Sequence, residues 1–124
     1  VPPAPDLPPV LDAACMDRLR ELERHSGRPV VKPVVDSFLA RAAQDLAEMR
    51  EALREADWQR PAFTAHRLKG SGLQIGFHRL AARLQELEAE GRDGRRAETA
   101  EGHLNQVEDE LRQAVAALRR APAG

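Results

Sequence analysis

The chain has 124 residues, of which 42% are hydrophobic and 3% are aromatic, and its 19 basic and 20 acidic side chains nearly balance. This length suits one domain, and the balanced charge argues against a nucleic-acid-binding surface. No apolar run approaches the roughly 18 residues of a membrane span, no secretion signal opens the chain, and Cys15 is the only cysteine, so we expect a cytoplasmic location without direct membrane contact.

The first ten residues, VPPAPDLPPV, predict an extended linker, because proline fixes the backbone and disfavours helix. The chain starts at Val1 rather than at an initiator methionine. We therefore expect residues 1–10 to tether a folded domain, residues 11–120, to domains upstream. Residues 121–124 are expected to form a disordered tail.

Two helices are predicted after the linker. The first covers about residues 12–24 and ends before the stop signals Gly27 and Pro29. The second covers about residues 31–55, where apolar side chains recur at spacings of three and four and form one buried stripe. The stripe consists of Val35, Phe38, Leu39, Ala42, Leu46, Met49 and Leu53.

A third helix is expected to begin after Asp57, a candidate N-cap, and to end near Gly76. Pro61 would lie in its first turns, where a missing N–H does least harm. A fourth helix is predicted at about residues 79–89, with Leu80, Leu84 and Leu87 facing inward. The glycine-containing segment EGRDGRR, residues 90–96, is predicted to be a turn.

A fifth helix is predicted over about residues 97–119. Its apolar residues form one seam: Ala97, Ala100, Leu104, Val107, Leu111, Ala114 and Leu118. Short loops between long amphipathic helices imply antiparallel neighbours. The predicted fold class is therefore all-α, an antiparallel up-and-down four-helix bundle with a short additional N-terminal helix.

The third helix contains the segment AHRLKGSGLQIG, in which three glycines weaken a predicted helix. At about 100° per residue, His66, Lys69, Gly70 and Leu73 share one face. The opposite face is predicted to pack into the core and consists of Thr64, Leu68, Ser71 and Ile75, with Gly72 beside it. His66 is therefore expected to point into solvent.

An exposed imidazole is mostly neutral at pH 7 and can act as a nucleophile. Lys69 lies one helical turn from His66, close enough to favour the neutral ring and to attract a phosphoryl group placed on it. Gly70 leaves bare backbone beside the ring, which would let a large partner approach.

The segment HRLKGSGLQIG resembles the motif of histidine-phosphotransfer (HPt) domains, H-x-x-K-G-S-x-x-x-x-G, at His66, Lys69, Gly70, Ser71 and Gly76. The resemblance implies a phosphorelay intermediate of a two-component system. Such a domain accepts a phosphoryl group from an aspartyl phosphate in one receiver domain and passes it to another receiver, the response regulator.

The resemblance assigns roles to individual residues. It makes His66 the phosphorylated nucleophile and Lys69 the charge partner of the phosphoryl group. Receiver docking is assigned to Arg67, Gly70, Leu73 and Gln74. Structural roles are assigned to Ser71, Gly72 and Gly76.

The resemblance also implies that the domain needs no cofactor of its own, because Mg²⁺ comes with the partner receiver. No nucleotide pocket is evident, so no autonomous kinase activity is expected. The proline-rich entry favours the C-terminal HPt domain of a membrane-bound hybrid sensor histidine kinase, monomeric when isolated. No metal site is expected, since His25, His78 and His103 lack ligand-like neighbours in the sequence and Cys15 is interpreted as a small core residue.

Two other functions remain open at this point. The chain could be a helical docking module in which Leu73 contacts a partner helix and His66 is dispensable. It could also be a degenerate HPt domain that regulates a kinase by binding alone. Phosphorylation of His66 by a phosphorylated receiver distinguishes the phosphorelay function from these two alternatives.

Overall fold

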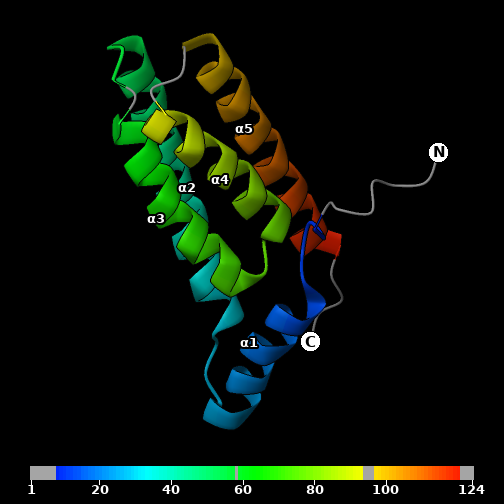
Figure 1. The fold of residues 1–124 in the computed structure, drawn as a ribbon. Coiled ribbons are helices and arrows are strands. Elements are labelled where there is room, and N and C mark those ends of the chain that lie inside the picture. Colours follow the sequence, from blue (N-terminus) through cyan, green and yellow to red (C-terminus); the bar gives the residue numbers. More distant parts are fainter. Residues whose placement is uncertain (1–7, 58, 94–96, 121–124) are drawn as a thin grey trace, which may run out of the picture.

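A computed structural model describes residues 8–57, 59–93 and 97–120, and every regular element in these ranges is a helix (Figure 1). The helices are α1 (Ala13–Ser26), α2 (Val31–Arg54), α3 (Gln59–Ile75), α4 (His78–Asp93) and α5 (Ala97–Arg120). The all-α prediction is confirmed. Most of the predicted linker, residues 1–7, and the predicted tail, residues 121–124, lie outside the described ranges.

Helices α2 to α5 form an up-and-down bundle in which consecutive helices run antiparallel (Figure 1). Each helix contacts the next, and α5 also packs against α2, which closes the ring of contacts. Helix α1 lies at one end of the bundle, where it touches α2 and α3. This arrangement agrees with the predicted bundle and its additional first helix.

Side-chain carboxylates cap the starts of both α1 and α2. Asp12 Oδ1 accepts from the backbone N–H of Ala14 at 2.9 Å and begins α1. Gly27 ends the same helix in the left-handed conformation, with φ 69°. Glu23 Oε2 then accepts from the backbone N–H groups of Val30 and Val31 at 2.8 and 3.0 Å, which satisfies donors at the start of α2.

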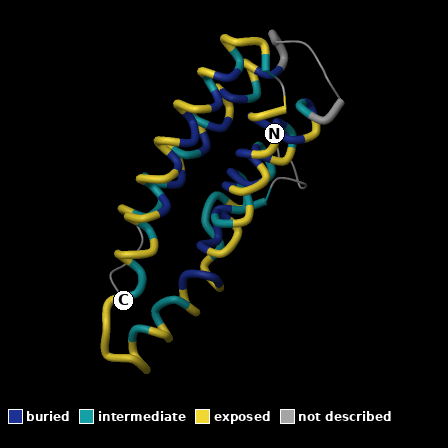
Figure 2. The backbone as a smooth tube through the Cα atoms, turned by 90° about the vertical axis from the view of Figure 1, so that its left-hand side faces the viewer, coloured by how far each residue is buried: buried dark blue, intermediate teal, exposed yellow. Residues whose placement is uncertain are grey.

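The buried residues of the four bundle helices lie on the sides that face one another (Figure 2), and the core consists mostly of aliphatic side chains with two phenylalanines. The rings of Phe38 on α2 and Phe77, which precedes α4, are tilted with centroids 5.3 Å apart. The predicted stripes supply the rest of this core: Ala42, Leu46, Met49, Leu68, Ile75, Leu80, Leu84, Leu87, Ala100, Leu104, Val107 and Ala114 are all buried. Burial on one face of each helix therefore fixes the bundle.

The predicted end of the fourth helix is wrong. Helix α4 continues through Gly91 to Asp93 instead of turning after residue 89, while residues 94–96 lie outside the described ranges. Glu90 is buried, and its Oε1 lies 3.5 Å from Nδ1 of His103 on α5. Packing of this last turn against α5 outweighs the cost of about 1 kcal/mol that a glycine imposes on a helix.

Residues at the end of the predicted linker lie against α4. Arg79 Nε donates to the carbonyl of Pro8 at 3.1 Å, and the Arg79 backbone N–H donates to the carbonyl of Pro9 at 3.2 Å. Val10 packs against the core.

None of the described helices is both long and apolar enough to cross a membrane.

Gly76 connects α3 to α4 at the point where α1 begins. Its φ is 104°, and a Cβ built there would lie 2.9 Å from the Cβ of Cys15 and 3.0 Å from the carbonyl oxygen of Asp12. Its own carbonyl accepts from the backbone N–H of Asp12 at 2.8 Å. Only glycine fits both the backbone angle and the contact.

We expect Gly76→Ala to lower the free energy of unfolding by about 1–3 kcal/mol, because the added methyl strains the turn and pushes α1 away. The matched control is Gly102→Ala on α5, where an added Cβ meets nothing within 4 Å and helix propensity alone should raise stability by about 0.5–1 kcal/mol. Chemical denaturation measures both variants. Equal stabilities would contradict the proposed strain at Gly76.

Candidate functional site

Helix α3, which carries His66, begins with a side-chain cap. Asp57 Oδ1 accepts from the backbone N–H groups of Gln59 and Arg60 at 3.1 Å, and Pro61 lies buried in the first turn. The N-cap prediction for Asp57 is thus confirmed. From this start the helix turns His66 toward solvent, with its side chain 60% exposed.

One nitrogen of the exposed imidazole is fixed by a buried acid. His66 Nδ1 lies 2.8 Å from Oε1 of Glu88, a residue of α4 whose side chain is 2% exposed. A carboxylate can only accept hydrogen bonds, so Nδ1 carries the proton in this contact. The neutral ring then has its lone pair on Nε2.

Lys69 reaches the same acid from one turn further along α3. Its Nζ donates to Oε2 of Glu88 at 2.9 Å and also to Oε1 of Gln85. The Lys69 ammonium therefore faces α4, and Glu88 connects it to the imidazole. The two oxygens of one buried carboxylate connect His66 with Lys69.

The residues around the imidazole form an open surface. Gly70 is exposed, and a Cβ added to it would meet no atom within 4 Å. Leu73 is 40% exposed, and Gln74 is also exposed. These residues therefore lie at the surface where the sequence analysis placed them.

Arg67 lies at the edge of this surface and is held by two contacts. Its Nη2 is 3.4 Å from Oδ1 of Asp45 on α2, and its guanidinium carbon lies 5.8 Å from the centre of the Phe63 ring. Burial raises the pKa of Asp45, while the charges of Arg67 and Arg41 oppose that shift. Arg67 thus has a structural partner as well as an exposed charge.

A family model described as Hpt domain matches residues 33–121 of the chain, which include the whole site. The chain belongs to the Hpt domain family.

Solved structures of similar proteins agree with this assignment. Histidine-containing phosphotransfer protein B (HptB) from Pseudomonas aeruginosa PAO1 is 26% identical, with a TM-score of 0.79, over 90% of this chain and 93% of that protein. The yeast phosphorelay protein YPD1 shares the fold at 20% identity and a TM-score of 0.66, over 72% of this chain and 55% of the yeast protein. No curated protein sequence matched the chain. The family match and the likeness to a histidine-containing phosphotransfer protein agree with the family resemblance of the motif around His66.

The residues to which the sequence assigned structural roles lie on the inner side of α3 or directly after its end. Gly72 is buried, and an added Cβ would lie 3.7 Å from the ring of Phe38, an ordinary contact distance. Ser71 is half-buried and lines a shallow hollow with Phe38 and Gln74. Gly72 therefore leaves room for Phe38, whereas Gly76 makes the tighter contact with α1.

Three residues near His66 were missed by the sequence analysis. Glu88 and Gln85 come from α4, and their approach to α3 depends on the relative register of two helices. Phe63 lies on α3 itself, 69% exposed, and lines a hollow with Gln59, Ala62, His66 and Gly91. Its position one turn before His66 could have revealed it, because a helical wheel places it on the same face.

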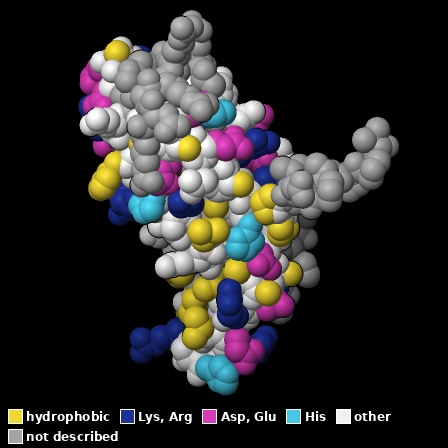
Figure 3. All heavy atoms as spheres, viewed as in Figure 1, with side chains coloured by type: hydrophobic (Ala, Val, Ile, Leu, Met, Phe, Trp, Pro, Cys, Tyr) yellow, Lys and Arg dark blue, Asp and Glu magenta, His cyan; other side chains and the backbone are white. Residues whose placement is uncertain are grey.

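The exposed surface of the domain around α3 and α4 has no single charge sign. Figure 3 shows hydrophobic, basic, acidic and histidine side chains interspersed over this face. Two large hydrophobic side chains of α3 are left in solvent: Phe63, about one turn before His66, and Leu73, about two turns after it.

Proposed function

We propose that this Hpt domain is a phosphorelay intermediate, and that His66 accepts a phosphoryl group from the aspartyl phosphate of one receiver domain and passes it to another. The observation that carries the proposal is an exposed imidazole whose Nδ1 is held by buried Glu88 at 2.8 Å. This contact leaves Nε2 as the nucleophile and aims it away from the bundle.

Neither phosphoryl transfer requires a proton to move. The Nε2 lone pair attacks phosphorus, the N–P bond forms, and the bond between phosphorus and the aspartyl oxygen breaks, which returns that carboxylate to the first receiver. In the second transfer, an aspartate of the next receiver attacks phosphorus and the N–P bond breaks. Nδ1 keeps its proton throughout, so the domain needs no separate acid or base.

Glu88 and Lys69 act on opposite charges during this reaction. Attack through Nε2 gives the ring positive charge, and the Glu88 carboxylate is already positioned at Nδ1 to stabilise it. Lys69 Nζ is bound to the same acid, close enough to attract the phosphoryl oxygens as they arrive. The pair thus favours transfer without a metal ion of its own, and we infer that the receiver supplies Mg²⁺.

The receiver is proposed to dock on the outward face of α3. Phe63 and Leu73 offer apolar contacts on either side of His66, and Gly70 leaves the backbone open between them. Arg67 and Gln74 lie exposed at the margin and are proposed to set partner choice. The isolated domain is proposed to act as a monomer, and the proline-rich start to join it to a hybrid sensor kinase.

The test uses a panel of receiver domains charged with acetyl phosphate and Mg²⁺. We expect at least one receiver to transfer its label to the domain, with a product that is stable in base and labile in acid, and mass spectrometry should place the label on His66. Receiver binding without label would instead favour a docking or regulatory module. The absence of both label and binding with every receiver of the panel would contradict the proposal.

Glu88→Gln tests the role of the buried acid, because an amide can donate to or accept from the imidazole and no longer selects one tautomer. We expect long-range ¹H–¹⁵N NMR spectra to show the Nδ1–H tautomer of His66 in the wild-type domain and a mixture in the variant. Phosphorylation should be about 10- to 100-fold slower, because the variant loses the free energy of one charged hydrogen bond in the transition state.

The control for this variant is Glu86→Gln, on the same helix. Glu86 pairs with Arg83 and His103 rather than with the site, so its loss should change neither the tautomer of His66 nor the rate. An unchanged tautomer in Glu88→Gln would show that Glu88 does not orient the nucleophile.

A further inference from the structure

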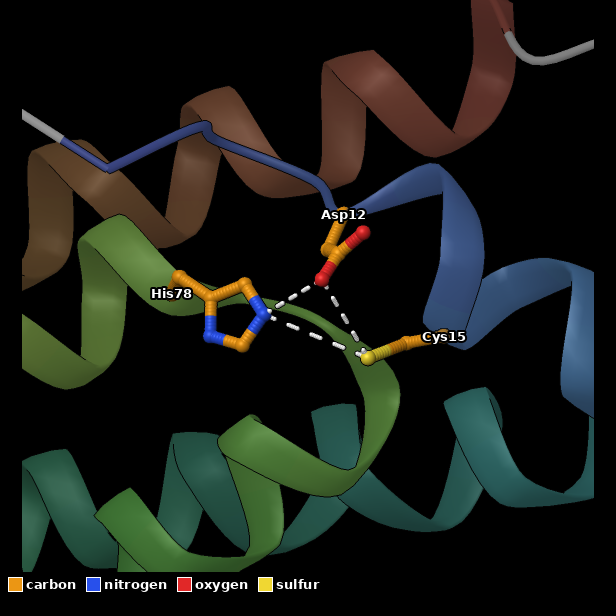
Figure 4. Close-up of side chains that lie close together, drawn as sticks. All are labelled: Asp12, Cys15 and His78. Carbon is orange, nitrogen blue, oxygen red and sulfur yellow. Dashed lines mark hydrogen bonds and ion pairs between the residues drawn. The ribbon is translucent and has the colours of Figure 1, made fainter.

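A cysteine, a histidine and a carboxylate converge where α1 meets the turn between α3 and α4 (Figure 4). His78 Nε2 lies 2.9 Å from Oδ2 of Asp12, and Cys15 Sγ lies 3.6 Å from the same oxygen and 4.0 Å from the same nitrogen. Sequence spacing did not reveal this cluster, since His78 is 66 residues from Asp12. Among the described residues, this is the group of side chains placed to share a metal ion.

We propose that Asp12, Cys15 and His78 bind a zinc ion. Zinc accepts thiolate, imidazole and carboxylate ligands at about 2.0–2.3 Å in tetrahedral geometry, so the ligand atoms should be about 3.3–3.6 Å apart. The three observed separations fall within about 0.5 Å of these values. Small side-chain rotations would therefore place all three atoms on one ion.

The donor set suits zinc better than magnesium or calcium. A thiolate and an imidazole are soft and borderline ligands, whereas magnesium and calcium require oxygen. Binding releases the Cys15 thiol proton to solvent and requires the His78 ring to carry its proton on Nδ1, which leaves Nε2 free to bind. A thiolate and a carboxylate then neutralise the two charges of the ion, so the three ligands and the bound ion together carry no net charge in this half-buried site.

Burial and backbone hydrogen bonds fix the positions of the three proposed ligands. Cys15 is buried at 4% exposure, and Asp12 and His78 are half-buried. The Asp12 backbone N–H bonds to the Gly76 carbonyl, which fixes the start of α1 two residues from His78. Arg18 Nη2 donates to Cys15 Sγ at 3.0 Å and can stay there as a donor to the bound sulfur.

Three protein ligands leave a fourth tetrahedral position, which water can fill. The ion would link the start of α1 to the α3–α4 turn, two parts of the chain that otherwise meet through few contacts. The effect of zinc is therefore expected on the docking of α1. The proposal does not depend on His66, which lies on the outward face of α3.

The test titrates the reduced 124-residue chain with Co²⁺ and then with Zn²⁺. We expect Co²⁺ to give a thiolate-to-metal charge-transfer band and visible bands of tetrahedral intensity, and Zn²⁺ to remove both by displacing cobalt. Zn²⁺ should also raise the melting temperature and slow proteolysis within α1, since a ligand that binds only the folded state stabilises it.

Variants locate the site. Cys15→Ser should abolish the charge-transfer band, and Asp12→Asn, which keeps an N-cap oxygen for Ala14, should weaken Zn²⁺ binding at least about tenfold. His78→Gln should weaken it similarly. The matched control is His103→Gln, since His103 also lies beside two carboxylates, Glu86 and Glu90, but near no thiol.

Two results would overturn the proposal. One is the absence of a charge-transfer band in folded, reduced protein. The other is Zn²⁺ affinity that is unchanged in Asp12→Asn and His78→Gln but falls in His103→Gln, which would move the metal to α4 and α5. Because Asp12→Asn keeps the cap of α1, circular dichroism of that variant separates loss of a ligand from loss of the helix.

Discussion

His66→Gln is expected to reduce phosphoryl acceptance from charged receivers to the background level. Glutamine has no imidazole nitrogen to form the N–P bond, and no other histidine of the described residues lies beside a buried carboxylate on an open helix face. The His66 side chain is 60% exposed, and a glutamine amide can still donate to Glu88. The free energy of unfolding should therefore change by less than about 1 kcal/mol.

The control is His103→Gln, which removes a half-buried histidine on α5 and should retain full labelling. Transfer is measured under single-turnover conditions with the receiver that labels the wild-type domain best, and stability by thermal melting. Label retained by His66→Gln would place the phosphoryl group elsewhere. Unfolding of that variant would instead mean that the imidazole carries a packing role.

Gly70→Gln should slow phosphoryl transfer by about 100-fold while leaving the domain as stable as the wild type or slightly more so. The new side chain enters open space, so nothing in the bundle must move, and helix propensity rises by somewhat less than 1 kcal/mol. Yet the side chain stands beside His66 and holds the receiver away. A displacement of about 1 Å is enough to cost two orders of magnitude in rate.

Gly102→Gln on α5 is the matched control, because Gly102 is also an exposed helical glycine with open space at its Cβ. It should gain the same helix propensity and transfer at the wild-type rate, since the site lies on α3 and α4. Rates are compared together with receiver affinity. A fully active Gly70→Gln would remove the reason we give for this glycine.

The sequence was informative wherever one helix determines the answer. The spacing of apolar residues in α2 and α5 predicted their buried faces, because a helix repeats every 3.6 residues. The same period placed His66, Gly70 and Leu73 together and outward, as the structure confirms. It failed at the end of α4, where burial of Glu90 against α5 extends the helix past a glycine that looked like a turn.

What the sequence could not supply is the register between helices. Glu88 meets His66 because the tight turn at Gly76 aligns α4 with α3, and no spacing along the chain encodes that alignment. Glu88 would also look like a solvated charge in a segment rich in acidic residues. The meeting of Cys15 with His78 has the same origin, since α1 is brought to the turn by the fold.

The dependence of His66 on a carboxylate from a different helix makes the chemistry of the domain conditional on its folding. His66 and Glu88 are 22 residues apart in the sequence. In the unfolded chain they do not stay in contact, so Glu88 no longer fixes the tautomer of His66. A peptide of residues 59–76 would carry the whole motif and still lack the oriented nucleophile. A partly unfolded domain would therefore not accept or transfer phosphoryl groups, so that unfolded molecules take no part in the proposed relay.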